Sequence, residues 1–170
     1  MQNSTSKPLA VGLTVIGILA RLVPHAPNFT PVGGVSLFAG GRLSGWRAYL
    51  LPLVLMLITD PLVGGYSFNT PFVYASFLIY VWIGTRLRST QNPAAFGAAA
   101  VAGSVQFFII TNFGAWLSPA ATYGHTAAGL MACYVAAIPF YGRTLLADLF
   151  YSAALFGAYA LLARRVPVRS

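Results

Sequence analysis

The sequence predicts an all-α membrane protein, a polytopic bundle of transmembrane helices. Hydrophobic residues make up 58% of the 170 residues, charged residues only 7%, and the mean hydropathy is +0.74. Soluble domains carry about 25% charged residues, so this chain cannot cover a water-facing surface of ordinary polarity. The apolar runs are long and continuous, which disfavours a β-barrel built from alternating strands of about ten residues. At this length we expect a single domain, residues 1–170.

Seven apolar segments can be drawn along the chain. They cover approximately residues 8–24, 31–43, 48–65, 71–86, 94–116, 125–140 and 144–163. A helix needs about 20 residues to cross the hydrocarbon core, so segments 31–43 and 125–140 are both short. The basic residues decide which of the two crosses, because cytoplasmic loops carry the excess of Lys and Arg.

The charge pattern favours a short re-entrant or outer-surface helix at 125–140. With that segment not crossing, only Arg21 and Arg143 lie toward the outside. The basic residues that then fall on the cytoplasmic side are Lys7, Arg42, Arg47, Arg86, Arg88, Arg164, Arg165 and Arg169. The sequence therefore predicts six transmembrane helices with both termini cytoplasmic.

This topology places most of the other polar groups in the outer half of the bundle. Charged groups at membrane depth are costly and tend to face an interior or a wet cavity. Aromatic residues form 14% of the chain, and an aromatic pocket with a few polar contacts suits a small organic ligand better than a bare ion. The predicted substrate-binding residues are Arg21, His25, Asp60, Asn112, Phe113, Trp116, Arg143 and Asp148.

The two acidic residues each leave alternatives open. Asp60 either binds a ligand, pairs with Arg21, or is a helix-end residue bonded to backbone amides. Asp148 stands five positions after Arg143, which is not an i,i+4 spacing, so we expect its partner on another helix. Its role is then either to face the binding site or to stabilise the bundle.

The other candidates also have structural alternatives. Prolines 24, 27 and 31 break the chain around His25, and we expect this apolar loop to pack over or line the cavity. A hydrogen-bonded position at the membrane interface is the alternative for His25 and His125. The interfacial aromatic belt is the alternative for Phe113 and Trp116.

Small residues indicate close helix packing at two places. Gly33, Gly34, Gly40 and Gly41 flank a short apolar stretch, and Ala95, Ala99 and Gly103 recur every four positions. Such spacing permits close helix contact, within the chain or with a partner. The single cysteine, Cys133, is typical of a small buried hydrophobe, and no multi-cysteine metal site is possible within one chain.

No catalytic signature is present, so we do not expect an enzyme. The sequence lacks G-x-S-x-G, H-E-x-x-H and a phosphate-binding glycine loop followed by Lys. The net charge of +8 comes from basic residues set singly or in pairs between apolar runs, which is not a nucleic-acid-binding pattern. The classes that remain are a membrane transporter, a sensor or assembly partner that moves nothing, and, less favoured, an intramembrane lipid enzyme.

Several strings resemble a family of small uncharacterised bacterial membrane proteins described as candidate transport proteins. The strings are RLVPHAPNFTPVGGVSLFAGGRL, LPLVLMLITDPLVG, TNFGAWLS, GLMACYVAAIPF and TLLADLFYSAALFG. In size and layout the chain is also similar to the substrate-binding S-components of energy-coupling-factor transporters. Those proteins have six helices, both termini cytoplasmic and a vitamin pocket in the outer half.

The resemblance implies uptake of a vitamin or cofactor precursor across a bacterial inner membrane. Some S-component-like proteins work alone, including solitary transporters for cobalamin and biotin, whereas others dock a shared ATPase module. The partners expected here are a vitamin-like substrate and the lipid bilayer, with an energising module or self-association left open. No resident cofactor is expected. A cobalamin-like substrate would need an axial ligand, for which Cys133, His25 and His125 are weak candidates.

Overall fold

The computed structural model describes residues 6–164 and is entirely helical over that range. The helices are α1 (Ser6–Leu19), the short 3-10 helix η1 (Ala20–Leu22), α2 (Val32–Arg42), α3 (Arg47–Val63), α4 (Thr70–Thr85), α5 (Pro93–Leu117) and α6 (Ala127–Ala163). The predicted all-α class is confirmed, and these residues contain no strand. Arg165 and Arg169, which entered the charge argument above, lie outside the described residues.

Helix α2 is the centre of the bundle. All 11 of its residues are buried, and it contacts each of the other five α-helices. Its glycines make this possible, because a Cβ on Gly40 would collide with the backbone of Val81 in α4, and one on Gly34 would collide with Tyr151 and the backbone of Ser152 in α6. The predicted packing role of these glycines is therefore confirmed.

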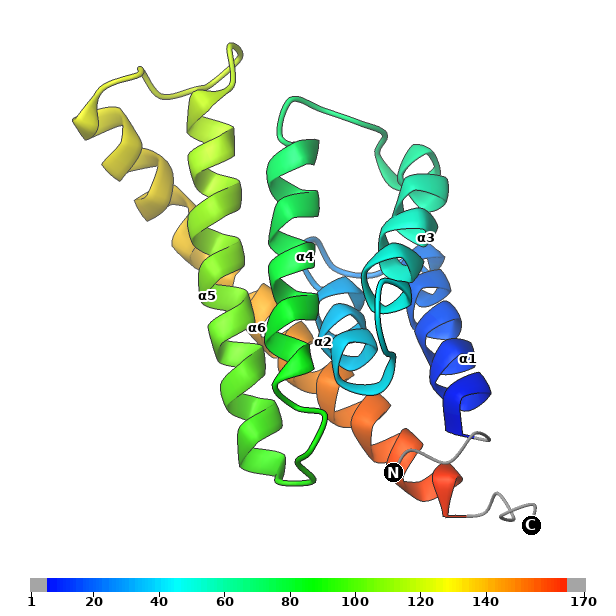
Figure 1. Ribbon diagram of the computed structural model, residues 1–170. Coiled ribbons are helices and arrows are strands. Elements are labelled where there is room, and N and C mark those ends of the chain that lie inside the picture. Colours follow the sequence, from blue (N-terminus) through cyan, green and yellow to red (C-terminus); the bar gives the residue numbers. More distant parts are fainter. Residues whose placement is uncertain (1–5, 165–170) are drawn as a thin grey trace.

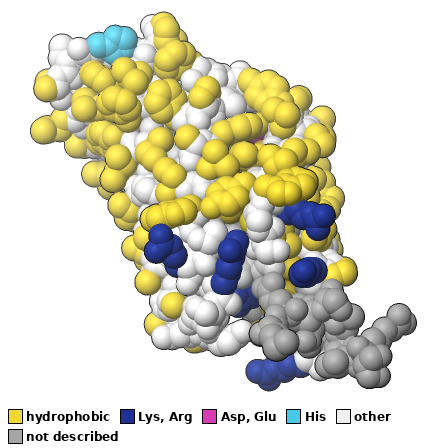
Figure 2. Space-filling view, in the orientation of Figure 1, with side chains coloured by type: hydrophobic (Ala, Val, Ile, Leu, Met, Phe, Trp, Pro, Cys, Tyr) yellow, Lys and Arg dark blue, Asp and Glu magenta, His cyan; other side chains and the backbone are white. Residues whose placement is uncertain are grey.

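The helices alternate in direction, so the first and last helices bring the described chain ends to the same end of the bundle (Figure 1). Basic side chains gather toward that end, whereas hydrophobic side chains cover most of the remaining face (Figure 2). We call this the basic end, defined by Lys7, Arg47, Arg86, Arg88 and Arg164. The opposite half, with the 64–69 and 118–126 connections at its tip and the 23–31 connection within the bundle, is called the polar end (Figure 1).

Helices α5 and α6 are long and apolar enough to cross a membrane. Only 28% and 33% of their most apolar stretches are buried, so they are not core helices of a soluble protein. Large apolar side chains such as Met131, Leu146 and Leu62 are more than 60% exposed. An apolar surface of this extent indicates a membrane protein.

The predicted break between segments 125–140 and 144–163 is wrong. The structure joins them in one helix of 37 residues, α6, which continues through Pro139, Gly142 and Arg143. Proline removes one backbone donor and one arginine can point to the surface, so neither has to end a helix that packs along α5. No separate re-entrant helix exists here.

The lengths of the other helices do not support six independent spans. Helix α2, at 11 residues, extends for about 16 Å, roughly half of a hydrocarbon core. By length and composition α5 and α6 alone, among the described helices, qualify as spans.

Candidate functional site

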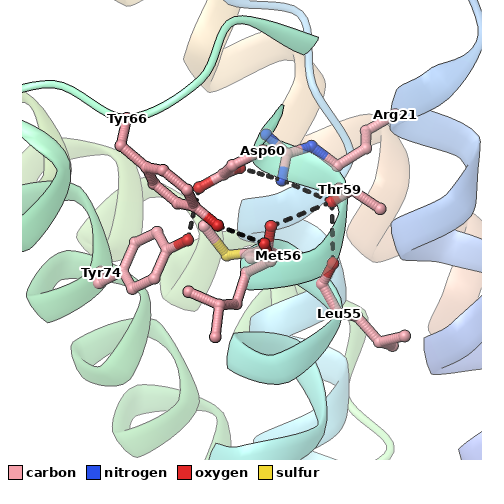
Figure 3. A network of polar contacts seen from close by, with 8 residues as sticks. Arg21, Leu55, Met56, Thr59, Asp60, Tyr66 and Tyr74 are labelled. Atoms are coloured by element: carbon pink, nitrogen blue, oxygen red, sulfur yellow. Dashed lines mark hydrogen bonds and ion pairs between the residues drawn. The ribbon is translucent and has the colours of Figure 1, made fainter. Parts of the chain in front are cut away.

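Arg21 and Asp60 form an ion pair at the polar end of the bundle. Arg21 follows α1 in η1, and its Nη1 lies 2.7 Å from Oδ1 of Asp60 near the end of α3. The same nitrogen donates to the Thr59 hydroxyl at 3.1 Å, and the Tyr74 hydroxyl of α4 donates to Oδ2 of Asp60 (Figure 3). The pairing alternative for Asp60 is therefore the one the structure shows.

A cavity of about 420 Å³ lies beside this ion pair; we call it the loop cavity. It is lined by Arg21, Leu22, Val23, Pro24, His25, Asn28, Thr30 and Val63. The proline-broken connection thus lines a cavity, as its sequence predicts. His25 is exposed there, and its Nδ1 lies 2.6 Å from the carbonyl oxygen of Val23.

A second cavity of about 230 Å³ lies deeper, between the 23–31 connection, α5 and α6; we call it the amide cavity. It is lined by Asn28, Asn69, Phe107, Phe108, Thr111, Asn112, Ala137, Phe140, Tyr141 and Thr144. Three amide side chains and two threonine hydroxyls offer both hydrogen-bond donors and acceptors. No charged side chain lines it.

Asn28 lines both cavities, as a wall residue that they share. Its φ of 64° lies in the left-handed region, where asparagine is enriched among residues other than glycine. This conformation turns the chain between Pro27 and Pro31 and leads it into α2. The wall residue that the two cavities share therefore has a backbone geometry that favours asparagine or glycine.

Two side-chain amides of the amide cavity differ in whether their polar atoms have hydrogen-bond partners. Asn112 donates through Nδ2 to the Phe108 carbonyl one turn earlier, at 2.8 Å. Asn69, which precedes α4, has a buried Oδ1 with no hydrogen-bond partner. A buried acceptor without a donor costs about 1–3 kcal/mol. This oxygen lies against Gly114 of α5, where an added Cβ would collide with it, so the packing of α4 on α5 holds it in place.

Asp148 lies apart from both cavities, in the core. It is 2% exposed and accepts a hydrogen bond from the Tyr80 hydroxyl of α4, so its partner is on another helix, as predicted. A Cβ on Gly33 would collide with its carboxylate, which places the carboxylate against the first turn of α2. There the free backbone N–H groups and the helix dipole favour an anion.

The aromatic candidates Phe113 and Trp116 do not line either cavity. Their rings contact each other at 5.6 Å, and Phe113 is 40% exposed. The Trp116 indole donates to the Gly124 carbonyl, and its ring meets His125 edge-on at 5.6 Å. These contacts hold the connection between α5 and α6.

Cys133 and Arg143 also do not line either cavity. Cys133 is buried where α6 packs on α5, with Sγ 3.6 Å from the Asn112 carbonyl oxygen. Arg143 is exposed on α6 and forms no ion pair within residues 6–164. Over the same residues, no three His, Cys, Asp or Glu side chains lie close enough together to hold a metal ion.

Sequence reasoning thus found Arg21, His25 and Asn112 among the cavity residues and missed the other asparagines and the threonines. Those missed are Asn28, Thr30, Asn69, Thr111 and Thr144. The proline-flanked Asn28 carried a usable signal, since asparagine between prolines is typical of a special turn. Thr111 and Thr144 lie inside apolar runs, where a hydroxyl can equally bond its own helix.

The fold and the two cavities define an all-helical, largely apolar protein with a polar, small-molecule-sized site at one end. Residues 1–169 match a family of unknown function (DUF6580), and the chain belongs to that family. No curated protein and no solved structure is significantly similar to it.

Proposed function

We propose that this chain is a membrane uptake protein that binds a small organic micronutrient, a vitamin or cofactor precursor, and moves it into the cell. The amide cavity carries the proposal, because it offers uncharged hydrogen-bonding groups beside aromatic walls, with the loop cavity next to it across Asn28. Such a lining suits an organic molecule with several polar edges.

The proposed placement has the basic end in the cytoplasm of a bacterium and the polar end outside the inner membrane. Helices α5 and α6 span the bilayer, and α1, α3 and α4 cross as parts of the packed bundle. The short α2 starts inside the bundle, after the 23–31 connection. Irregular backbone at membrane depth is tolerated where protein or a water-filled cavity surrounds it, which is the situation of this connection. Both termini are then cytoplasmic.

Size and charge narrow the proposed substrate. The amide cavity holds about 230 Å³ and the loop cavity about 420 Å³, whereas pockets for drug-sized ligands span about 300–1,000 Å³. A single-ring or two-ring molecule fits this space, and a corrinoid such as cobalamin does not. The charge of Arg21 is already balanced by Asp60, so a neutral or weakly charged substrate is favoured.

The basic end is closed beneath the cavities. Arg42, at the end of α2, is 4% exposed and lies over the rings of Phe96, Phe156 and Tyr159 at 5.8, 4.8 and 5.4 Å from their centroids. Its Nη1 also donates to the carbonyl of Leu87. Release into the cell would require this cluster to open. The energy for that step comes either from an energising module or from the substrate gradient, as in a solitary transporter.

The proposal is tested first by ligand binding. Purified protein is examined by native mass spectrometry for a retained molecule and by thermal shift against vitamins and their precursors. A true ligand raises the unfolding temperature as its concentration rises. Asn112→Ala should abolish that shift, because its amide lines the cavity. Phe113→Ala, on the exposed side of the same helix, should leave the shift intact.

Two further outcomes separate the alternatives. Uptake of the stabilising compound into proteoliposomes supports a transporter, whereas binding without uptake identifies a sensor or assembly partner. If no compound stabilises the protein, or if both variants behave alike, the cavities are not the binding site.

A further inference from the structure

A third cavity lies at the basic end, on the outside of the bundle between α1 and α3. It is a groove of about 470 Å³, which we call the basal groove. Its lining residues are Lys7, Val11, Leu43, Ser44, Trp46, Arg47, Leu50, Leu51 and Val54. The walls are aliphatic or aromatic. The polar side chains are Lys7 at the start of α1, Arg47 at the start of α3 and Ser44 in the connection between α2 and α3.

The cations of the basal groove have no counter-charge among the residues that the structure describes. Lys7 and Arg47 are exposed, and neither forms an ion pair within the described residues. The only two carboxylate side chains of the sequence, Asp60 and Asp148, are buried elsewhere with Arg21 and Tyr80. Because α1 and α3 both start at this end, their helix dipoles also favour an anion there. No side-chain carboxylate of the chain therefore balances these cations, which leaves the groove suited to an anionic group of another molecule.

We propose that the basal groove binds an anionic phospholipid, with an acyl chain along its apolar floor and the phosphate at Lys7 and Arg47. The guanidinium of Arg47 presents a planar fork that matches phosphate oxygens, and Lys7 supplies a second, mobile charge. The Ser44 hydroxyl lies on the same rim as a further donor. Trp46, 67% exposed beside Arg47, is placed where aromatic side chains anchor at the headgroup level.

The shape of the groove excludes simpler occupants. A free phosphate ion would use the rim and leave the apolar floor bare. A lipid without net negative charge would fill the floor and leave both cations unbalanced. A second copy of the chain has no exposed carboxylate to offer, because both of its aspartates are buried. An anionic lipid covers the apolar floor with its acyl chain and balances the rim cations with its phosphate. Its binding does not depend on what the polar end transports.

The test compares defined lipids on the full chain in nanodiscs. Native mass spectrometry should retain one phosphatidylglycerol per protein, displaced little by phosphatidylcholine, and added phosphatidylglycerol should raise the unfolding temperature saturably. At about 1 kcal/mol for each basic residue near an anionic surface, K7Q/R47Q should weaken binding about 30-fold. The matched control is R86Q, at the same end but outside the groove, where Arg86 lies over the Trp82 ring at 4.6 Å; it should change binding little.

A second variant keeps Lys7 and Arg47 and blocks the apolar floor of the basal groove with a larger side chain. Val54 is 45% exposed in the groove wall, so V54W should fold normally and still lose the retained lipid. Stabilisation by inorganic phosphate alone, equal retention of phosphatidylcholine, or an equal loss in R86Q would each overturn the proposal. A negative result would leave the vitamin-binding assay unaffected, so the two proposals fail separately.

Discussion

The two aspartates of this chain lie in different electrostatic settings, although each accepts a hydrogen bond from a tyrosine of α4. Asp60 has Arg21 at 2.7 Å and lies beside a cavity at the polar end. Asp148 has no cationic partner among the described residues and is held by Tyr80 against the start of α2. Tyr74 and Tyr80 are six residues apart, about 9 Å along the helix.

This difference shows that the fold surrounds its two carboxyl groups in different ways. Near the polar end there is room for a guanidinium, and a full opposite charge balances Asp60. In the core, α2 approaches so closely that even a Cβ on Gly33 would collide with the Asp148 carboxylate. Only a hydroxyl and backbone dipoles fit there. Asp60 is therefore held by two side chains, Arg21 and Tyr74, whereas Asp148 depends on the packing of three helices.

Removing the partner of Asp60 should have the largest effect. Arg21→Ala leaves a nearly buried carboxylate without counter-charge, and we expect a loss of about 3 kcal/mol in the free energy of unfolding. The double variant Arg21→Gln with Asp60→Asn should recover most of it, because no uncompensated charge remains. Reversible unfolding in mixed micelles measures both. A loss below about 1 kcal/mol would show that the pair behaves as an exposed one.

The packing around Asp148 is tested by Gly33→Ala. The added methyl has to displace the carboxylate or the Tyr80 ring, and we expect a loss of about 2 kcal/mol. Gly157→Ala, also in a helix but with nothing near the added methyl, should be neutral or slightly stabilising. Equal stabilities of the two variants would mean that α2 and α6 are not in close contact.

The two tyrosines provide a direct comparison of the aspartates. Tyr80→Phe leaves Asp148 without its side-chain donor, and we expect a loss of about 1.5 kcal/mol. Tyr74→Phe should cost clearly less, because Asp60 keeps Arg21. The same unfolding assay applies, and the reverse order would contradict the assignment of the two settings.

The smallest effect on stability is expected at Asn28. Asn28→Ala removes the short polar side chain whose local hydrogen bonding lets asparagine adopt the left-handed region, and it should cost about 1 kcal/mol. Asn28→Gly should be almost neutral for stability, yet it removes the amide that lines both cavities. Loss of ligand-induced stabilisation in Asn28→Gly, at unchanged unfolding temperature without ligand, would separate binding from folding. Retained stabilisation would remove Asn28 from the site.

Several features of the fold and site could be read from the sequence because they depend on local or pairwise chemistry. The helices follow from long apolar runs, and the packing role of Gly33 and Gly40 follows from their lack of a side chain. The pair of Arg21 and Asp60 could be anticipated because each is a rare charge near the end of an apolar run. The continuity of α6 could not be read from the sequence, because Pro139 and Arg143 are tolerated inside a helix that packs on a neighbour.

The sequence by itself determined an apolar, all-helical chain whose basic residues gather at one end, because hydropathy and charge are properties of the residues themselves. Only the tertiary structure decided which polar residues share a cavity. Asn28, Asn69 and Thr111 lie about 40 residues apart along the chain, and no periodicity connects them. A cavity is formed where the packed surfaces of helices fail to meet, and that depends on how the helices cross rather than on any one segment.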